Sequence, residues 1–212
     1  MKDGKKVVTG TNIGQLITWD AQNLEFGTCI DIHEERIMAM ILSNYQKYLI
    51  TGDKAGYIIY CNKKIDKKNR FEAHKDACVR DLSFSMSSMK LMSCSDDRTA
   101  RIWDFATSKQ ENIFQEHNSD VTTCDWHPFY SLACTGSKDS TIRVWDPRNS
   151  SGKSIIQLQA HNSTVNQVRW NPINGIYLLT GSRDNKIKMF DIRNMKNEVK
   201  DFDGHNETIQ VI

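Results

Sequence analysis

Three residue types that together can activate a nucleophile recur at a fixed spacing along this chain of 212 residues. They are a histidine, a serine or threonine, and an aspartate, which in hydrolases remove the proton from a hydroxyl that then attacks the substrate. The hydroxyl residue follows the histidine by 18 or 19 residues, and the aspartate follows the hydroxyl residue by 4. The complete sets are His74, Ser93 and Asp97; His117, Thr135 and Asp139; and His161, Thr180 and Asp184.

The recurrence of these sets argues against catalysis. An active site needs one accessible nucleophile, whereas these sets repeat in three consecutive stretches of the chain. Trp103 and Trp145 lie 6 residues beyond the aspartate in the first two sets, and Phe190 takes this position in the third. An indole N–H, a hydroxyl, an imidazole and a carboxylate can form hydrogen bonds in series, which satisfies polar groups that folding buries. We therefore predict buried structural networks and no catalytic residue.

A repeat of strands must position these networks. One residue in each repeat marks the end of a strand, and successive markers are separated by 42, 42, 42 and 45 residues. Between them lie short apolar segments divided by turn residues, which predict four antiparallel strands per repeat rather than helices. This pattern is typical of the blades of a β-propeller of the WD-repeat kind, so the predicted fold class is all-β. The markers are Trp19, Cys61, Trp103, Trp145 and Phe190.

The repeat length predicts about five blades. Complete blades are expected at 33–73, 74–116, 117–160 and 161–204, with partial blades at 1–32 and 205–212. The segment 208–212 is expected to be the first strand of the last of these. Propellers contain four to eight blades, so the pieces fit a closed five-bladed ring. The interpretation that we favour is an internal part of an incomplete seven-bladed propeller.

The first two repeats depart from the pattern. Thr51 keeps the position of the hydroxyl, but Ala55 and Cys61 stand where the aspartate and the tryptophan are expected. Ile13 takes the position of the aspartate in the first repeat. We therefore expect incomplete networks in these two repeats, and the most rigid blades between His74 and Trp145.

Composition excludes several classes of protein. Lys and Arg total 28 against 26 Asp and Glu, and the net charge of +2 excludes a polycation that binds nucleic acid by bulk charge. The longest apolar run, at 37–42, is far shorter than the roughly 20 residues of a membrane-spanning helix. The six cysteines include no Cys-x-x-Cys pair, so we expect reduced thiols, no metal and no other cofactor. Five basic residues within 62–70 favour a solvated loop over an RNA phosphate contact.

Longer stretches of the sequence resemble one subfamily of WD-repeat proteins. The resemblance covers essentially the whole chain, the first blade included, is most specific over 71–194, and includes the phenylalanine at position 190. It is to the WD-repeat subunit of the cleavage and polyadenylation specificity factor, which acts in pre-mRNA 3′-end processing. The stretches that carry the resemblance are 71–77, 94–105, 121–128, 136–140, 178–184 and 190–194.

This resemblance implies a non-enzymatic nuclear subunit. In the family, the propeller helps a zinc-finger subunit to recognise the AAUAAA signal, and it docks onto a large multi-propeller scaffold subunit. Phe26 matches a family phenylalanine that stacks on the U–A pair of the signal, and Cys29 falls where an aliphatic neighbour can stand. The other RNA contacts of the family come from a basic arm before the propeller, so this chain alone is expected to bind the hexamer weakly or not at all. From the sequence alone, Phe26 is as well explained by packing within the blade.

Two other functions fit the sequence. Trp145-Asp146-Pro147-Arg148 and Phe190-Asp191-Ile192-Arg193 resemble the box by which substrate receptors of cullin-type ubiquitin ligases dock an adaptor. A local pair between each arginine and a nearby acid is the simpler explanation. The chain also fits a WD-repeat platform for some other assembly, because propellers host many functions.

Overall fold

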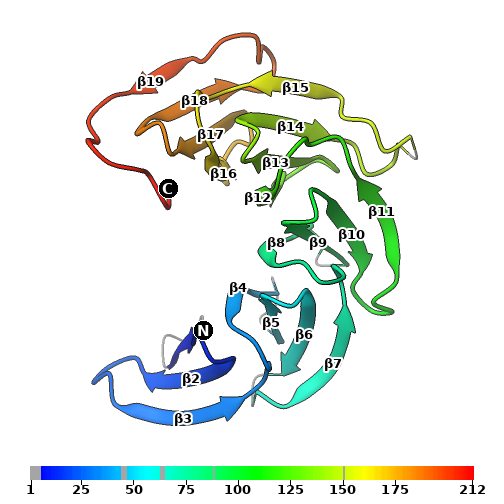
Figure 1. Ribbon diagram of the computed structural model, residues 1–212, viewed down its shortest axis with the longest axis vertical. Helices are drawn as coiled ribbons and strands as arrows, with labels where there is room; N and C mark the ends of the chain where they lie inside the picture. The colour runs from blue at the N-terminus through cyan, green and yellow to red at the C-terminus, as the bar shows by residue number, and fades with distance from the viewer. Residues whose placement is uncertain (1–5, 44–46, 63–64, 88, 150) are drawn as a thin grey trace. The chain divides into compact units, whose positions relative to one another are not determined.

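The computed structural model describes residues 6–43, 47–62, 65–87, 89–149 and 151–212, without the side chains of residues 67 and 68. Within these ranges the regular structure consists of 19 β-strands, arranged in five antiparallel sheets (Figure 1). One sheet has three strands and the other four have four strands each. The predicted all-β fold with blade-like sheets is confirmed. No helix in the described part of the chain is long and apolar enough to cross a membrane.

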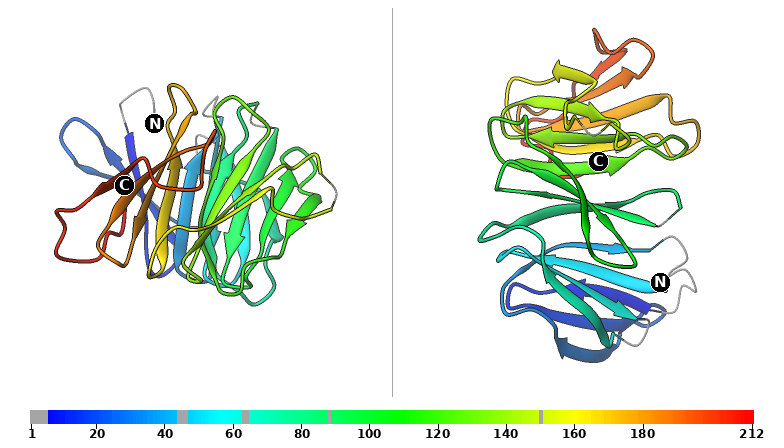
Figure 2. Two further views of the ribbon diagram at one scale, coloured as in Figure 1. Left: turned by 90° about the horizontal axis from the view of Figure 1, so that it is seen from above. Right: turned by 90° about the vertical axis from the view of Figure 1, so that its right-hand side faces the viewer.

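The chain divides into two compact units, Met1–Asp81 and Leu82–Ile212, and β8 runs across the division. Each sheet is a separate twisted layer in which consecutive strands lie edge to edge (Figure 2). The first sheet contains β1 (Lys6–Gly10), β2 (Gln15–Asp20) and β3 (Phe26–Asp31). The second contains β4 (Ile37–Leu42), β5 (Tyr48–Asp53), β6 (Tyr57–Asn62) and β7 (Lys67–Glu72).

The other three sheets are built in the same way, with strands in chain order. The third contains β8 (Val79–Phe84), β9 (Lys90–Ser95), β10 (Ala100–Asp104) and β11 (Gln110–Phe114). The fourth contains β12 (Val121–Trp126), β13 (Ala133–Ser137), β14 (Thr141–Trp145) and β15 (Ile156–Gln159). The fifth contains β16 (Val165–Trp170), β17 (Tyr177–Ser182), β18 (Ile187–Asp191) and β19 (Lys200–Phe202).

A glycine on the second strand of a sheet makes room for the next sheet. A Cβ atom built on Gly136 would lie 2.7 Å from Cγ1 of Val165, the first residue of β16. A Cβ atom on Gly52 would lie 2.6 Å from Cγ1 of Val79, the first residue of β8. Real side chains do not approach so closely, so each glycine allows a β-branched residue of the following blade to pack against the strand.

The predicted first strand at 208–212 is not found: no strand lies within 205–212. Ile209 nevertheless packs against Gly181 on β17 as Val165 packs against Gly136. The main chain of this segment bonds to the fifth sheet instead of to a strand partner: Ile209 N donates to Ser182 O at 3.2 Å, and Ile209 O accepts from Asn166 Nδ2 at 2.6 Å. A strand requires a ladder with a neighbouring strand, and these contacts do not form one.

The first strands of the second unit are tied to one another by a carboxylate. Asp125 on β12 accepts the main-chain N–H of Trp170 on β16 at 2.8 Å and the hydroxyl of Ser83 on β8 at 3.2 Å. Ser83 Oγ in turn accepts the N–H of Trp126 at 3.0 Å. One side chain therefore bridges the first strands of three consecutive sheets, and it satisfies a main-chain donor that the sheet ladders leave unpaired.

Candidate functional site

The set in the fourth sheet forms one continuous network. His117 Nδ1 lies 2.9 Å from Asp139 Oδ2, and His117 Nε2 lies 2.7 Å from Thr135 Oγ1. Trp145 donates its indole N–H to the same Thr135 oxygen at 2.9 Å. A carboxylate only accepts, so Nδ1 carries the imidazole proton and Nε2 accepts the threonine hydroxyl proton. Each polar group has a partner, and Thr135 is fully buried, which leaves no accessible nucleophile.

The fifth sheet repeats this arrangement without the indole. His161 Nδ1 lies 2.9 Å from Asp184 Oδ2, and Nε2 lies 2.8 Å from Thr180 Oγ1. Because Phe190 has no N–H, nothing replaces the tryptophan donor, and Thr180 Oγ1 instead lies 3.3 Å from the carbonyl oxygen of Lys188. The phenylalanine is buried, at 1% exposure, so it keeps the packing of the tryptophan but loses one hydrogen bond.

Three members of the predicted set, Ser93, Asp97 and Trp103, lie on β9, on β10 or in the turn between them. Trp103 donates its indole N–H to Ser93 Oγ at 2.8 Å. Asp97 accepts the Thr99 hydroxyl at 2.6 Å and forms an ion pair with Arg101 at 3.0 Å. His74 belongs to the first unit and is fully buried.

The second sheet corrects the expectation of an incomplete network in part: it has a carboxylate, although Cys61 supplies no indole N–H. His33 Nε2 lies 2.7 Å from Thr51 Oγ1, and His33 Nδ1 lies 2.7 Å from Oδ2 of Asp53. Asp53 stands two residues before Ala55, at the position that Ser137 holds in the fourth sheet, and its carboxylate also accepts the N–H of Tyr57 at 2.8 Å. The carboxylate is therefore displaced in sequence and not lost.

We expect Asp53→Ser to lower the free energy of unfolding by about 1–3 kcal/mol, because it leaves the buried Nδ1–H of His33 without its acceptor. Adding Ala55→Asp to this variant recreates the serine and aspartate positions of the fourth sheet, and it should restore most of the loss. Urea denaturation of the parent, both single variants and the double variant measures the effect. A parent-like Asp53→Ser variant would show that the 2.7 Å contact contributes nothing.

Burial and hydrogen bonding set the charges of these groups. Burial opposes the charge of Asp139, but hydrogen bonds from His117 and Thr141 hold the pKa of its carboxyl well below the ordinary value. Asp184 shows the same balance between burial and hydrogen bonds, and its pKa is also lowered. Burial lowers the pKa of His161, although Asp184 opposes this shift. At neutral pH the network of the fifth sheet therefore combines a neutral His161 imidazole with an ionised Asp184 carboxylate, and Asp139 in the fourth sheet is also ionised.

Stability should fall as the pH falls, in two steps. His161 has a lowered pKa in the folded state, so the unfolded chain takes up a proton first as the pH falls below the ordinary value of about 6.5. Asp139 and Asp184 also have lowered pKa values, so their contribution is complete above about pH 4 and is lost below it. Urea denaturation between pH 7.5 and 3 measures both steps, and His161→Gln should reduce the first, to which His127 also contributes because burial lowers its pKa. Stability that is constant between pH 7 and 5 would contradict this assignment.

A β-bulge shapes the surface around Phe26 and Cys29. Between β2 and β3, Ile17 pairs with Cys29 and Trp19 pairs with Phe26, so β3 contains one residue more than β2. Paired residues point to the same side of a sheet, so the bulge places Phe26 and Cys29 on one face although they are three positions apart. Thr18 Oγ1 fixes the bulge by accepting the N–H of Thr28 at 2.9 Å.

The Phe26 side chain is exposed but oriented. It is 61% exposed, and its ring meets the ring of Trp19 edge to face, with centroids 6.0 Å apart. Trp19 is itself fixed, because its indole N–H donates to Thr9 Oγ1 at 2.9 Å. Cys29 is an exposed free thiol on the same face. This surface presents a preoriented aromatic ring to solvent, which is the geometry that stacking on a base requires.

Comparison with known proteins decides the family. The family model described as WD domain, G-beta repeat matches residues 66–104, 108–146 and 152–191, which together exceed half of the chain. The chain belongs to the WD-repeat family. The three matched segments end at Asp104, Asp146 and Asp191, directly after the marker residues that define the repeat.

Curated relatives of this WD-repeat chain confirm the resemblance to the polyadenylation subfamily. Polyadenylation factor subunit 2 of Candida albicans is 33% identical over 195 residues, which cover 92% of this chain and 35% of the relative. Polyadenylation factor subunit 2 of Neurospora crassa is 30% identical over 180 residues, which cover 85% and 27%. Human WD repeat-containing protein 37 is 34% identical over 103 residues, or 49% of this chain and 20% of the relative. The chain thus spans about a third of the length of the polyadenylation relatives.

The two arginines of the predicted adaptor boxes in this WD-repeat chain form local pairs. Arg148 bonds to Asp146 through Nε at 2.9 Å and Nη2 at 2.8 Å, and Arg193 bonds to Asp191 in the same way, at 2.9 and 2.6 Å. Their guanidinium groups are paired with acids of their own turns, as the simpler explanation predicts. In the basic stretch 62–70, Lys63 and Lys64 lie outside the described residues.

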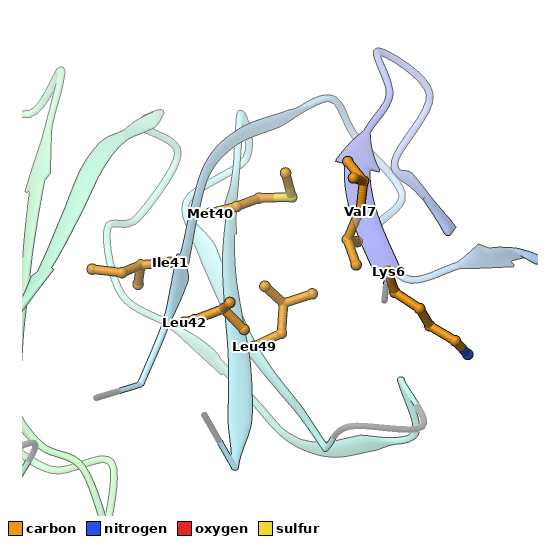
Figure 3. A pocket seen from close by; sticks show the side chains of 7 residues that line it. Lys6, Val7, Met40, Ile41, Leu42 and Leu49 are labelled. Atoms are coloured by element: carbon orange, nitrogen blue, oxygen red, sulfur yellow. The ribbon is translucent and has the colours of Figure 1, made fainter. Parts of the chain in front are cut away.

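An apolar pocket of about 450 Å³ lies beside β1 in the first unit (Figure 3). Figure 3 shows Val7 on β1 facing Met40 and Leu49 of β4 and β5 across the opening, with Lys6 at its edge. Among the described residues β1 pairs only with β2, whereas the corresponding strand β5 pairs with both β4 and β6. The pocket therefore borders the outer edge of β1. In each four-stranded sheet, the first strand occupies the corresponding edge.

Proposed function

We propose that this chain is part of a non-enzymatic WD-repeat subunit of the nuclear machinery that cleaves and polyadenylates pre-mRNA. The observation that carries the proposal is the similarity to polyadenylation factor subunit 2 of two fungi over 85–92% of the chain. In this role the blades act as a scaffold that docks a zinc-finger subunit and a large multi-propeller scaffold subunit. The subunit helps these partners to bind the AAUAAA signal of the pre-mRNA.

Depletion of the protein from its own cells tests this role. Loss of a 3′-end processing subunit should make transcripts run past their normal cleavage sites and should lower the amount of polyadenylated mRNA. Sequencing of RNA 3′ ends measures both effects. Re-expression of the protein should restore the normal ends. Unchanged 3′ ends after complete depletion would refute the proposal.

We further propose that Phe26 stacks on a base of the signal, with Cys29 beside it. The support is the exposed ring, its fixed contact with Trp19, and the bulge that places both residues on one face. In this role the chain contributes a platform, and basic segments outside it supply the phosphate contacts.

In the assembled complex, Phe26→Ala should weaken binding of an AAUAAA RNA by about 1–3 kcal/mol, because one base loses its stacking partner. Phe26→Trp keeps an aromatic face and should retain most of the affinity. Leu24→Ala is a matched control, since Leu24 is 68% exposed and precedes the same strand. Fluorescence anisotropy with labelled RNA measures all three. Equal affinities of the Phe26→Ala and parent complexes would remove Phe26 from the RNA site.

A further inference from the structure

Apolar side chains gather in three equivalent loops of the second unit. These loops follow the first strands of their sheets, and their described residues are 85–87 and 89, 127–132 and 171–176. Five large apolar side chains within them are between 48% and 85% exposed. We call them the apolar loop surface, which consists of Met86, Met89, Phe129, Tyr130 and Ile173.

The three loops leave the sheets at the same end. Trp170 N donates to Asp125 and Val168 N donates to Thr123, so β16 runs beside β12 in the same direction. The bonds of Ser83 to Asp125 and Trp126 place the end of β8 beside the end of β12. Loops that follow parallel strands emerge together, so the five side chains share one end of the unit.

A buried histidine holds the central part of this surface. His127 is 1% exposed, and its Nδ1 accepts the main-chain N–H groups of Phe129 at 3.0 Å and Tyr130 at 2.9 Å. Its Nε2–H donates to the carbonyl oxygen of Gly175 at 2.9 Å, which links the loop to the one that carries Ile173. Phe129, Tyr130 and the loop that carries Ile173 therefore stand on backbone that these bonds hold, which lowers the entropy cost of binding a partner.

The chemistry of the loops selects the kind of partner. None of the three contains Lys, Arg, Asp or Glu. Binding of RNA or of an anionic membrane depends on cationic side chains, which these loops lack. The guanidinium groups of Arg148 and Arg193 in neighbouring turns are already paired with Asp146 and Asp191. Exposed aromatic and methionine side chains on an uncharged surface are typical of protein interfaces.

We propose that the apolar loop surface is a docking site for an uncharged, apolar segment of a partner protein. The site is made of residues of the second unit, whereas the proposed RNA contact uses Phe26 of the first unit. It does not depend on a role in polyadenylation, because it rests on the exposed side chains, their fixed backbone and the absence of charge.

Selection from a displayed library of random peptides, with the full chain as the target, tests the site. Enriched peptides should be apolar and without net charge. Their affinity should fall by more than about tenfold for the double variant Tyr130→Ser/Ile173→Ser, because aromatic and aliphatic anchors dominate such interfaces. Both side chains are mostly exposed, at 67% and 85%, so the variant should keep the thermal stability of the parent. Ile113→Ser and Val211→Ser, which change exposed apolar residues outside the loops, should leave the affinity unchanged.

Four results would overturn the proposal. The first is enrichment of no peptide, or of charged peptides. The second is affinity for the enriched peptides that survives the double variant. The third is binding of a short RNA or of anionic vesicles that the double variant abolishes. The fourth is self-association in light scattering that the double variant removes, which would make the surface a contact between copies of the chain.

Discussion

Replacement of Trp145 by alanine should lower the free energy of unfolding by about 3–5 kcal/mol, the largest effect that we expect of any single substitution. Trp145 is fully buried, and its ring stacks on Phe114 with centroids 4.6 Å apart. Its loss leaves a cavity in the core of the second unit and removes the indole donor from Thr135.

The size of the effect can be divided between packing and hydrogen bonding. Trp145→Phe reproduces what Phe190 does in the fifth sheet, so it should cost only about 1–2 kcal/mol, from a smaller ring and one lost hydrogen bond. Trp19→Ala is a control for a tryptophan that is not fully buried, and it should cost less than Trp145→Ala. Chemical denaturation measures all three. A Trp145→Ala variant within 1 kcal/mol of the parent would mean that this network does not hold the unit together.

Asp125→Ala is expected to produce the second large loss, about 2–4 kcal/mol, because it leaves a main-chain N–H and a hydroxyl without their acceptor. These donors belong to Trp170 and Ser83, on the first strands of the two neighbouring sheets. The substitution should therefore destabilise strands of more than one sheet. Hydrogen-exchange measurements should show faster exchange of the amides on both β12 and β16.

A surface carboxylate of the same sheet provides the control for this variant. Asp120 forms an ion pair with Lys138, and the side chains are 25% and 41% exposed. Asp120→Ala should cost no more than about 1 kcal/mol, as is usual for exposed pairs. If the two variants lost the same stability, Asp125 would be an ordinary surface acid and not a link between three strands.

The sequence predicts the strands and most of the networks because both depend on local spacing. Four strands per repeat follow from the recurrence of the markers and the alternation between them, and the sets around His117 and His161 come together at hydrogen-bonding distances. Both sets combine residues on adjacent strands of one sheet with a histidine just before its first strand. Such short-range geometry is nearly the same in each blade.

Three features depend on geometry that spacing does not show. Asp53 reaches His33 from a position two residues early, since a carboxylate from either position can reach the same imidazole. The bulge in β3 brings Cys29 to the same face of the sheet as Phe26. The one extra residue that forms the bulge cannot be recognised in the sequence. The segment 208–212 has the composition of a strand, but its main chain bonds to the fifth sheet without a ladder. The sequence Thr51-Gly52-Asp53, in which an acid directly follows a Thr-Gly pair, is the signal that could have indicated the displaced carboxylate of Asp53.

We propose above that this chain works within the polyadenylation machinery. Affinity purification of the tagged protein from its own cells, followed by mass spectrometry, tests this claim most directly. We expect the subunits of the 3′-end cleavage and polyadenylation complex to be recovered, with the zinc-finger subunit and the large multi-propeller scaffold subunit among them. Recovery of a cullin adaptor, or of another assembly, without polyadenylation subunits would contradict a role in polyadenylation.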